Sequence, residues 1–304
     1  CARINALIMA CLARAAARHG IEVMAYIFMG NHFHLLVRAP RCNLSEFMKD
    51  FQGCLSVRVK AFHGLGEGIF SQRFHDVALL DESCVFEELM YILANAVEAG
   101  LVDMPGEYEG LCSLGQHMSG EAVVGRWLNQ DRLTRLRKRD SKADDESCAE
   151  YHELFLTPLP GMEGMSQEAR AAGISRALAL RCAQIVRKRG PIKKPTVLPS
   201  SLSSTSGHPS PYARPAVSKQ TEYCPVALSR CVARKEEYEE HLKNTTHNYY
   251  RAKLKLYSSK KRRGKVVFPA GTTPPGLSRC VPFKKKELES SSGQPVYRLI
   301  DFTA

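Results

Sequence analysis

The sequence predicts an α+β fold, in which helices cover an antiparallel sheet. Residues 2–18 and 82–100 have apolar side chains at helical spacing. Residues 21–29 and 32–38 are two extended-type apolar segments separated by a Gly-Asn pair, which indicates a hairpin. Because helical and extended segments follow one another in the order α-β-β-α-β-α over roughly the first 110 residues, we expect one layered unit.

The remaining elements of this unit have their own start and stop signals. A helix is predicted from Asn43 to about residue 62, with Gly64 close behind its end. Residues 68–79 resemble a third strand, and Asp81 precedes the next helix as a capping residue. A further strand before residue 1 would complete a ferredoxin-like unit, so we expect that the first strand of the sheet is missing.

The composition changes beyond about residue 120. A helix is predicted over 166–190 and another over 235–257, separated by a stretch rich in proline and serine. The C-terminal part is therefore expected to be helical, basic and partly disordered. We divide the chain into the layered α+β domain at 1–120, a helical extension at 121–190, a linker at 191–232 and a basic helical tail at 233–304.

Charge is distributed unevenly along the chain, whose formal net charge is +12. Residues 1–120 hold 9 basic and 13 acidic side chains, and the rest of the chain holds 34 and 18. Such asymmetry is typical of a segment that binds a polyanion. The cluster Lys260, Lys261, Arg262 and Arg263 could hold DNA phosphates by counterion release, although a solvated charge run explains it equally well.

The eleven cysteines form no C-x-x-C pair, so we expect reduced thiols rather than a disulfide framework or a zinc ribbon. No apolar run approaches the ~18 residues of a membrane span, and the N-terminus lacks the order of a signal peptide. The sequence therefore predicts a soluble cytoplasmic protein that does not bind membranes.

Two histidines, His32 and His34, alternate with Phe33 in the second predicted strand. Residues i and i+2 of a strand share one face, so both imidazoles should project side by side while Phe33 faces the core. Two imidazoles so placed can clamp one divalent metal ion. A half-buried strand edge is the alternative interpretation.

Tyr91 and Asn95 lie one turn apart in the helix predicted over 82–100, outside its apolar stripe. We expect them on the polar side of that helix, where a phenol oxygen and an amide oxygen could face the two histidines. An aromatic residue on a polar face is also compatible with an ordinary amphipathic surface.

Three blocks, GNHFHLLVR, SQRFHDVALLDE and YILANAVEAGLV, resemble in order and spacing the REP-associated tyrosine transposases of the HUH single-tyrosine superfamily. The resemblance covers residues 1–115 approximately. It implies that His32 and His34 bind Mg²⁺ or Mn²⁺, that Tyr91 is the nucleophile and that Asn95 is the third metal ligand. It also offers Arg38 and Arg73 as DNA-binding residues, although an ordinary surface arginine explains Arg73 equally well.

The function implied by this resemblance is that of a metal-dependent DNA transposase and endonuclease. Such an enzyme cleaves and rejoins single-stranded or hairpin DNA through a covalent 5′-phosphotyrosine. We expect it to act in the bacterial cytoplasm, in association with the nucleoid. The sequence permits a homodimer and does not fix the oligomeric state.

Two departures from the family pattern favour an alternative, a catalytically inactive DNA-binding relic. Glu98 stands where the family has arginine, which should weaken phosphate binding by about 1 kcal/mol or more. In the family the missing first strand lies beside the histidine strand, so its loss should leave backbone groups unpaired. A zinc hydrolase is a third option, but no acidic residue has a suitable spacing from the histidines.

Overall fold

The computed structural model describes residues 2–64, 66, 69–70, 74–140, 142–191, 227–258 and 297–303. It confirms the α+β class, with a five-stranded mixed sheet in the order β1-β2-β7-β3-β6 and a separate pair, β4-β5. The strands are β1 (Glu22–Phe28), β2 (His32–Arg38), β3 (His75–Leu79), β4 (Val123–Leu128), β5 (Ala149–Leu154), β6 (Ala227–Leu228) and β7 (Tyr297–Thr303). The helices are α1 (Ala2–His19), α2 (Leu44–His63), α3 (Glu82–Glu98), α4 (Leu114–Ser119), α5 (Gln130–Arg139), α6 (Gln167–Arg189) and α7 (Val232–Ser258).

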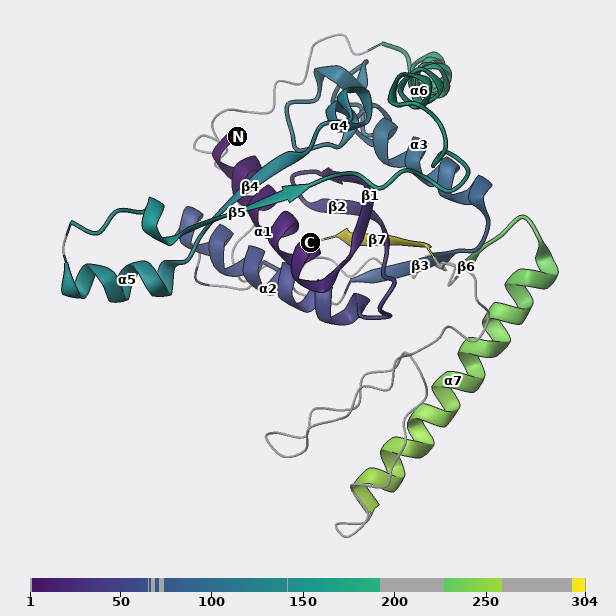
Figure 1. Cartoon of the computed structure of the whole chain (residues 1–304). Coiled ribbons are helices and arrows are strands. Elements are labelled where there is room, and N and C mark those ends of the chain that lie inside the picture. Colours follow the sequence, from purple (N-terminus) through teal and green to yellow (C-terminus); the bar gives the residue numbers. More distant parts are fainter. Residues whose placement is uncertain are drawn as a thin grey trace.

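Helices cover both faces of the larger sheet (Figure 1). Helices α1 and α2 pack on one face, where Phe28, Phe33 and Phe51 belong to one apolar core. Helix α3 packs on the other face and α6 packs against α3, which forms a second core around Leu36 and Leu89. Because both faces are covered, β1 and β2 are buried at nearly every position, and β1 is apolar at all but its first residue.

The predicted β-hairpin forms between β1 and β2. The backbone N–H of Met29 donates to the carbonyl of His32 at 2.8 Å, which closes the turn at Gly30 and Asn31. The strands then pair in antiparallel register from Phe28 and Phe33 outward, with one irregularity near Val23.

The expectation that β2 lacks a neighbour is wrong, because β7 fills the middle of the sheet. Strand β7 pairs antiparallel with β2 on one side and with β3 on the other (Figure 1, yellow arrow). Its Leu299 enters the core against α3 and its Ile300 enters the core against α1 and α2. The sheet is also not purely antiparallel as expected, because β6 pairs with β3 in parallel register.

The predicted ends of two helices are partly confirmed. Helix α2 ends at Gly64, whose φ of +66° is the left-handed conformation that glycine adopts readily. Asp81 precedes α3 as expected, but its carboxylate does not cap that helix. It accepts hydrogen bonds from the Ser229 hydroxyl, the Arg230 N–H and the Arg234 guanidinium, and so ties α7 to α3.

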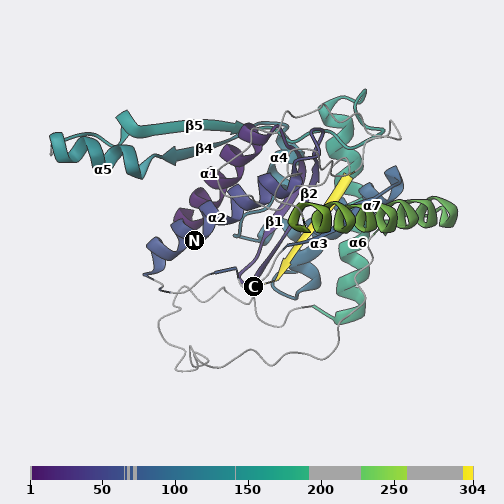
Figure 2. The same cartoon turned by 90° about the horizontal axis from the view of Figure 1, so that it is seen from below.

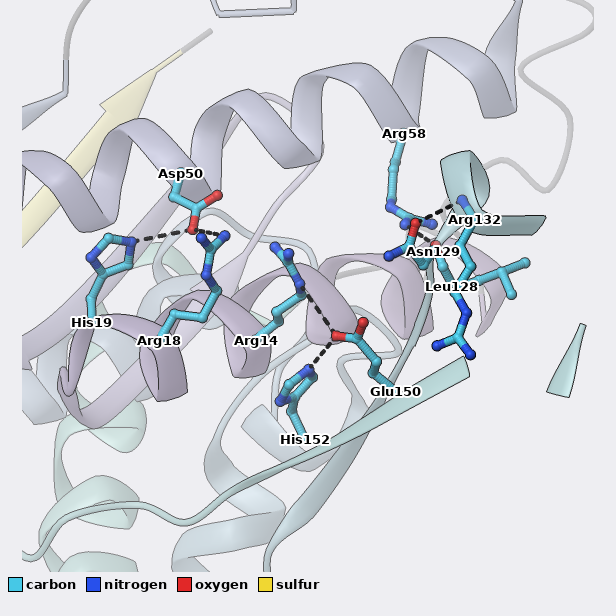
Figure 3. Close-up of polar contacts among 10 residues, drawn as sticks. All are labelled: Arg14, Arg18, His19, Asp50, Arg58, Leu128, Asn129, Arg132, Glu150 and His152. Atoms are coloured by element: carbon cyan, nitrogen blue, oxygen red, sulfur yellow. Dashed lines mark hydrogen bonds and ion pairs between the residues drawn. The ribbon is translucent and has the colours of Figure 1, made fainter. Parts of the chain in front are cut away.

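The β4-β5 hairpin and α5 extend from the side of the molecule that carries α1 and α2 (Figure 2). The sequence pattern does not predict this arm. The guanidinium carbons of Arg14 and Arg58 lie 4.3 and 3.5 Å from the ring centre of Trp127 on β4, while Arg14 also pairs with Glu150 on β5 (Figure 3). The arm is therefore fixed to both helices by charged side chains that stack on an aromatic ring.

No helix within the described part of the chain is long and apolar enough to cross a membrane. Helices α6 and α7 confirm the helices predicted over 166–190 and 235–257. Most of the predicted linker at 191–232 lies outside the described residues.

Candidate active site

The two histidines of β2 point toward α3. The ring centres of His32 and His34 lie 5.2 Å apart, so the two imidazoles share one face of the sheet as the i, i+2 spacing predicts. Phe33 between them packs on the opposite face, with its ring 5.2 Å from Phe28 and 5.8 Å from Phe51. Burial of Phe33 thus fixes the direction in which both histidines project.

Asn95 of α3 reaches both histidine rings. Its Oδ1 lies 3.4 Å from Nε2 of His32, and its Nδ2 lies 3.3 Å from Nε2 of His34. The expectation that Asn95 occupies the polar side of its helix is wrong, because only 5% of it is exposed. Asn95 lies between α3 and β2, and α6 packs against α3 as well, so that ten of the seventeen residues of α3 are buried.

Tyr91, one turn before Asn95, lies against the imidazole of His34. Its ring centre is 5.1 Å from that of His34, in an edge-to-face arrangement. The structure therefore brings together His32, His34, Tyr91 and Asn95, which are about sixty residues apart in the sequence.

The hydrogen bonds indicate which ring nitrogens accept. Nδ1 of His32 lies 2.7 Å from Oδ1 of Asn31, and the tautomer with its proton on Nδ1 donates to that oxygen and presents the Nε2 lone pair toward Asn95. Nδ2 of Asn95 donates to Nε2 of His34, which therefore also accepts. In this tautomer two acceptors face each other, Nε2 of His32 and Oδ1 of Asn95. Nε2 of His34 accepts from the Nδ2 of the same amide.

This donor set fits a divalent cation. Two imidazole nitrogens and one amide oxygen would replace the acceptor-to-acceptor contact with three ligand bonds, and Asn31 would orient the His32 ring from outside. The described residues contain no group of three His, Cys, Asp or Glu side chains that could hold a metal. A metal bound here would therefore need the Asn95 amide or groups from the substrate to complete its coordination.

Glu98 is paired with an arginine that the sequence interpretation did not connect to this site. Nη2 and Nε of Arg181 on α6 donate to Oε1 of Glu98 at 2.7 and 3.2 Å. The Arg181 guanidinium carbon also lies 5.9 Å from the Tyr91 ring centre. No motif marks Arg181, since it stands in an ordinary helical pattern and reaches the site only through the packing of α6 on α3.

The candidate DNA-binding residues fall outside this cluster. Arg38 is at the opposite end of β2 from His32 and forms an ion pair with Glu22, whose hydrogen bond raises the pKa of Arg38. The other candidates lie outside the described residues: Arg73, Lys260, Lys261, Arg262 and Arg263.

The backbone of β7 runs directly beside the histidines. Its register pairs His32 with Thr303 and His34 with Asp301, while His75 on β3 pairs with Asp301 from the other side. The aromatic and aliphatic residues of 297–303 were the available signal for this strand, although sequence alone does not show which strands it joins.

Comparison with known proteins identifies no relative: no family model, no curated protein and no solved structure matches the chain.

Proposed function

We propose that this protein is a metal-dependent DNA transposase and endonuclease that cuts and rejoins single-stranded or hairpin DNA with Tyr91. The observation that carries the proposal is the meeting of Tyr91 and Asn95 with His32 and His34 across the interface of β2 and α3. The cluster contains a phenol, an amide and two imidazoles within a largely apolar interface. Polar groups are costly to place there, so we take the cluster as support for phosphodiester transfer rather than for a purely structural role.

In the proposed reaction, the Tyr91 oxygen loses its proton and attacks the phosphorus of a DNA phosphodiester. A bond forms between that oxygen and phosphorus, and the bond to the 3′ oxygen breaks. The 3′ oxygen leaves with the bonding electron pair and takes up a proton, which yields a 5′-phosphotyrosine and a 3′-hydroxyl. Attack by a hydroxyl on the phosphotyrosine reverses the step without ATP.

His32, His34 and Asn95 are the residues that would hold Mg²⁺ or Mn²⁺ in this site. When bound, the ion would neutralise the negative charge that builds up on the phosphate oxygens. Imidazole ligands alone suit zinc or copper, whereas an amide oxygen and phosphate oxygens favour the harder ions. The rings of His34 and Tyr91 pack together, which holds the phenol beside the ligands.

The alternative is a DNA-binding relic without activity, suggested by Glu98 and by the expected loss of a strand. The structure weakens both arguments for the relic. Strand β7 occupies the position beside β2, and Arg181 neutralises the Glu98 carboxylate. We accordingly favour the enzyme, acting in the bacterial cytoplasm on nucleoid-associated DNA, with a homodimer as a compatible state.

Incubation with a labelled DNA hairpin and Mn²⁺ tests this proposal. We expect a covalent protein–DNA adduct on a denaturing gel, formed by the parent and absent from Tyr91→Phe, because the variant keeps the ring and lacks only the attacking oxygen. Tyr250→Phe, at an exposed position on α7, is the matched control and should form the adduct as the parent does. Adduct formation by Tyr91→Phe would contradict the assignment, and a parent that binds the hairpin without forming any adduct would indicate the relic.

A further inference from the structure

Arg181 is held at the edge of the site by contacts with two residues of α3. Its guanidinium carbon is 5.9 Å from the Tyr91 ring centre, and its Nη2 and Nε donate to Glu98 at 2.7 and 3.2 Å. The exposed fractions of the Arg181 and Glu98 side chains are 33% and 31%. The guanidinium is thus oriented by protein contacts and remains accessible to a large ligand.

The two bonds to Glu98 use only part of the hydrogen-bonding capacity of Arg181. A guanidinium carries five N–H groups in a planar fork, and Glu98 accepts one from Nε and one from Nη2. Glu98 does not engage the two N–H groups of Nη1 or the second N–H group of Nη2. Paired N–H groups of this geometry match two oxygens of a phosphate, which is why arginine is frequent at phosphate sites.

We propose that Arg181 binds a phosphate of the DNA strand next to Tyr91, and that Glu98 positions the guanidinium for this contact. The ligand class, a DNA phosphodiester, rests on the proposed function. In this arrangement the Glu98 carboxylate does not repel the strand, because it orients a cation that α6 contributes. The positive charge comes from a different element of the chain than the family pattern implies.

DNA binding measured without cleavage tests the phosphate contact. In a Tyr91→Phe background, fluorescence anisotropy with a labelled single-stranded oligonucleotide is recorded over a range of salt concentrations. Arg181→Ala should weaken binding about tenfold and lower the salt slope by about one released counterion. Arg181→Lys should retain most of the slope, because it keeps the charge. The matched control Arg176→Ala, an exposed position on the same helix, should change affinity less than about twofold.

A double-variant cycle tests the positioning role of Glu98. Glu98→Gln alone should weaken oligonucleotide binding about threefold, because the guanidinium loses its orienting partner. When Arg181 is already alanine, Glu98→Gln should not weaken binding further, because it then removes only an unpaired negative charge. Thermal melting of each variant shows whether it remains folded.

The results separate this inference from the proposed function. If the parent forms no tyrosine adduct while Arg181→Ala still lowers the salt slope, the cleavage activity is wrong and the phosphate site stands. If Arg181→Ala keeps the parental affinity and slope, or if Arg176→Ala loses as much, the assignment of Arg181 is overturned.

Discussion

At the scale of single residues, His117 on α4 is a buried histidine in an unfavourable position for charge. Only 8% of it is exposed, and within the described part of the chain its Nε2 has no hydrogen-bond partner. Burial is the main reason that its pKa is lowered to about 4. The positive charge of Arg170 lowers the pKa further, and a hydrogen bond with the Met24 backbone partly opposes the shift. The fold therefore favours the neutral imidazole.

This shift predicts a loss of stability at acidic pH. The unfolded chain protonates His117 near pH 6.5, whereas the folded chain does so only near pH 4. Stability is therefore complete above pH 6.5 and falls as the pH drops to about 4, by at most about 3 kcal/mol. Urea unfolding of His117→Gln should lack this component of the pH dependence, whereas exposed His247→Gln should retain it. Parallel pH curves for the parent and His117→Gln would contradict the account.

At the scale of elements, the β4-β5 hairpin lies directly against α1 at Gly125. A β-carbon at this position would be 2.8 Å from Cα of Ala10 and 2.9 Å from the carbonyl oxygen of Met9. Both are backbone atoms, so the contact cannot be relieved by a side-chain rotation. The close approach explains why glycine interrupts a strand that otherwise carries valine and tryptophan.

Gly125→Ala should consequently destabilise the protein by about 1–3 kcal/mol, because the hairpin must move away from α1. The matched control is Gly53→Ala in α2, where nothing lies within 4 Å of the added carbon. That variant should be stabilised by up to about 1 kcal/mol, since alanine favours a helix interior. Urea denaturation midpoints measure both changes, and equal midpoints for the two variants would exclude the close contact as the cause.

Local patterns in the sequence predict most of these elements and both residue pairs of the site. The spacing of His32 and His34 places them on one face, and Tyr91 and Asn95 follow from a helical step of four. The packing of Asn95 against the β2 histidines is not predictable in this way, and it makes Asn95 a buried residue rather than an exposed one. Arg181 was missed for the same reason, because its role depends on packing between distant segments.

At the scale of the whole molecule, the sheet is completed by a strand from the far end of the chain. Strand β7 lies between β2 and β3 although more than two hundred residues separate it from either of them. Periodicity identifies an extended segment but not its neighbours, so the expectation of a missing strand was wrong. In physical terms, the buried side chains of β7 offset the entropy of closing a long connection, which grows only slowly with length.

Leu299→Ala tests whether β7 is an integral part of the core. Leu299 is 5% exposed and packs in the core against α3, so its truncation should cost about 2–5 kcal/mol. Leu254→Ala, at a position on α7 that is 70% exposed, should change stability by less than about 0.5 kcal/mol. Chemical denaturation measures both, and a neutral Leu299→Ala would show that β7 is not packed in the sheet.

The most direct test of the central claim is to locate the covalent bond between the protein and DNA. The adduct formed with hairpin DNA and Mn²⁺ is digested with protease and nuclease, and the peptides are sequenced by mass spectrometry. We predict a residual nucleotide on the oxygen of Tyr91, attached through its 5′ phosphate. A nucleotide on any other residue, or none on the protein, would contradict the account.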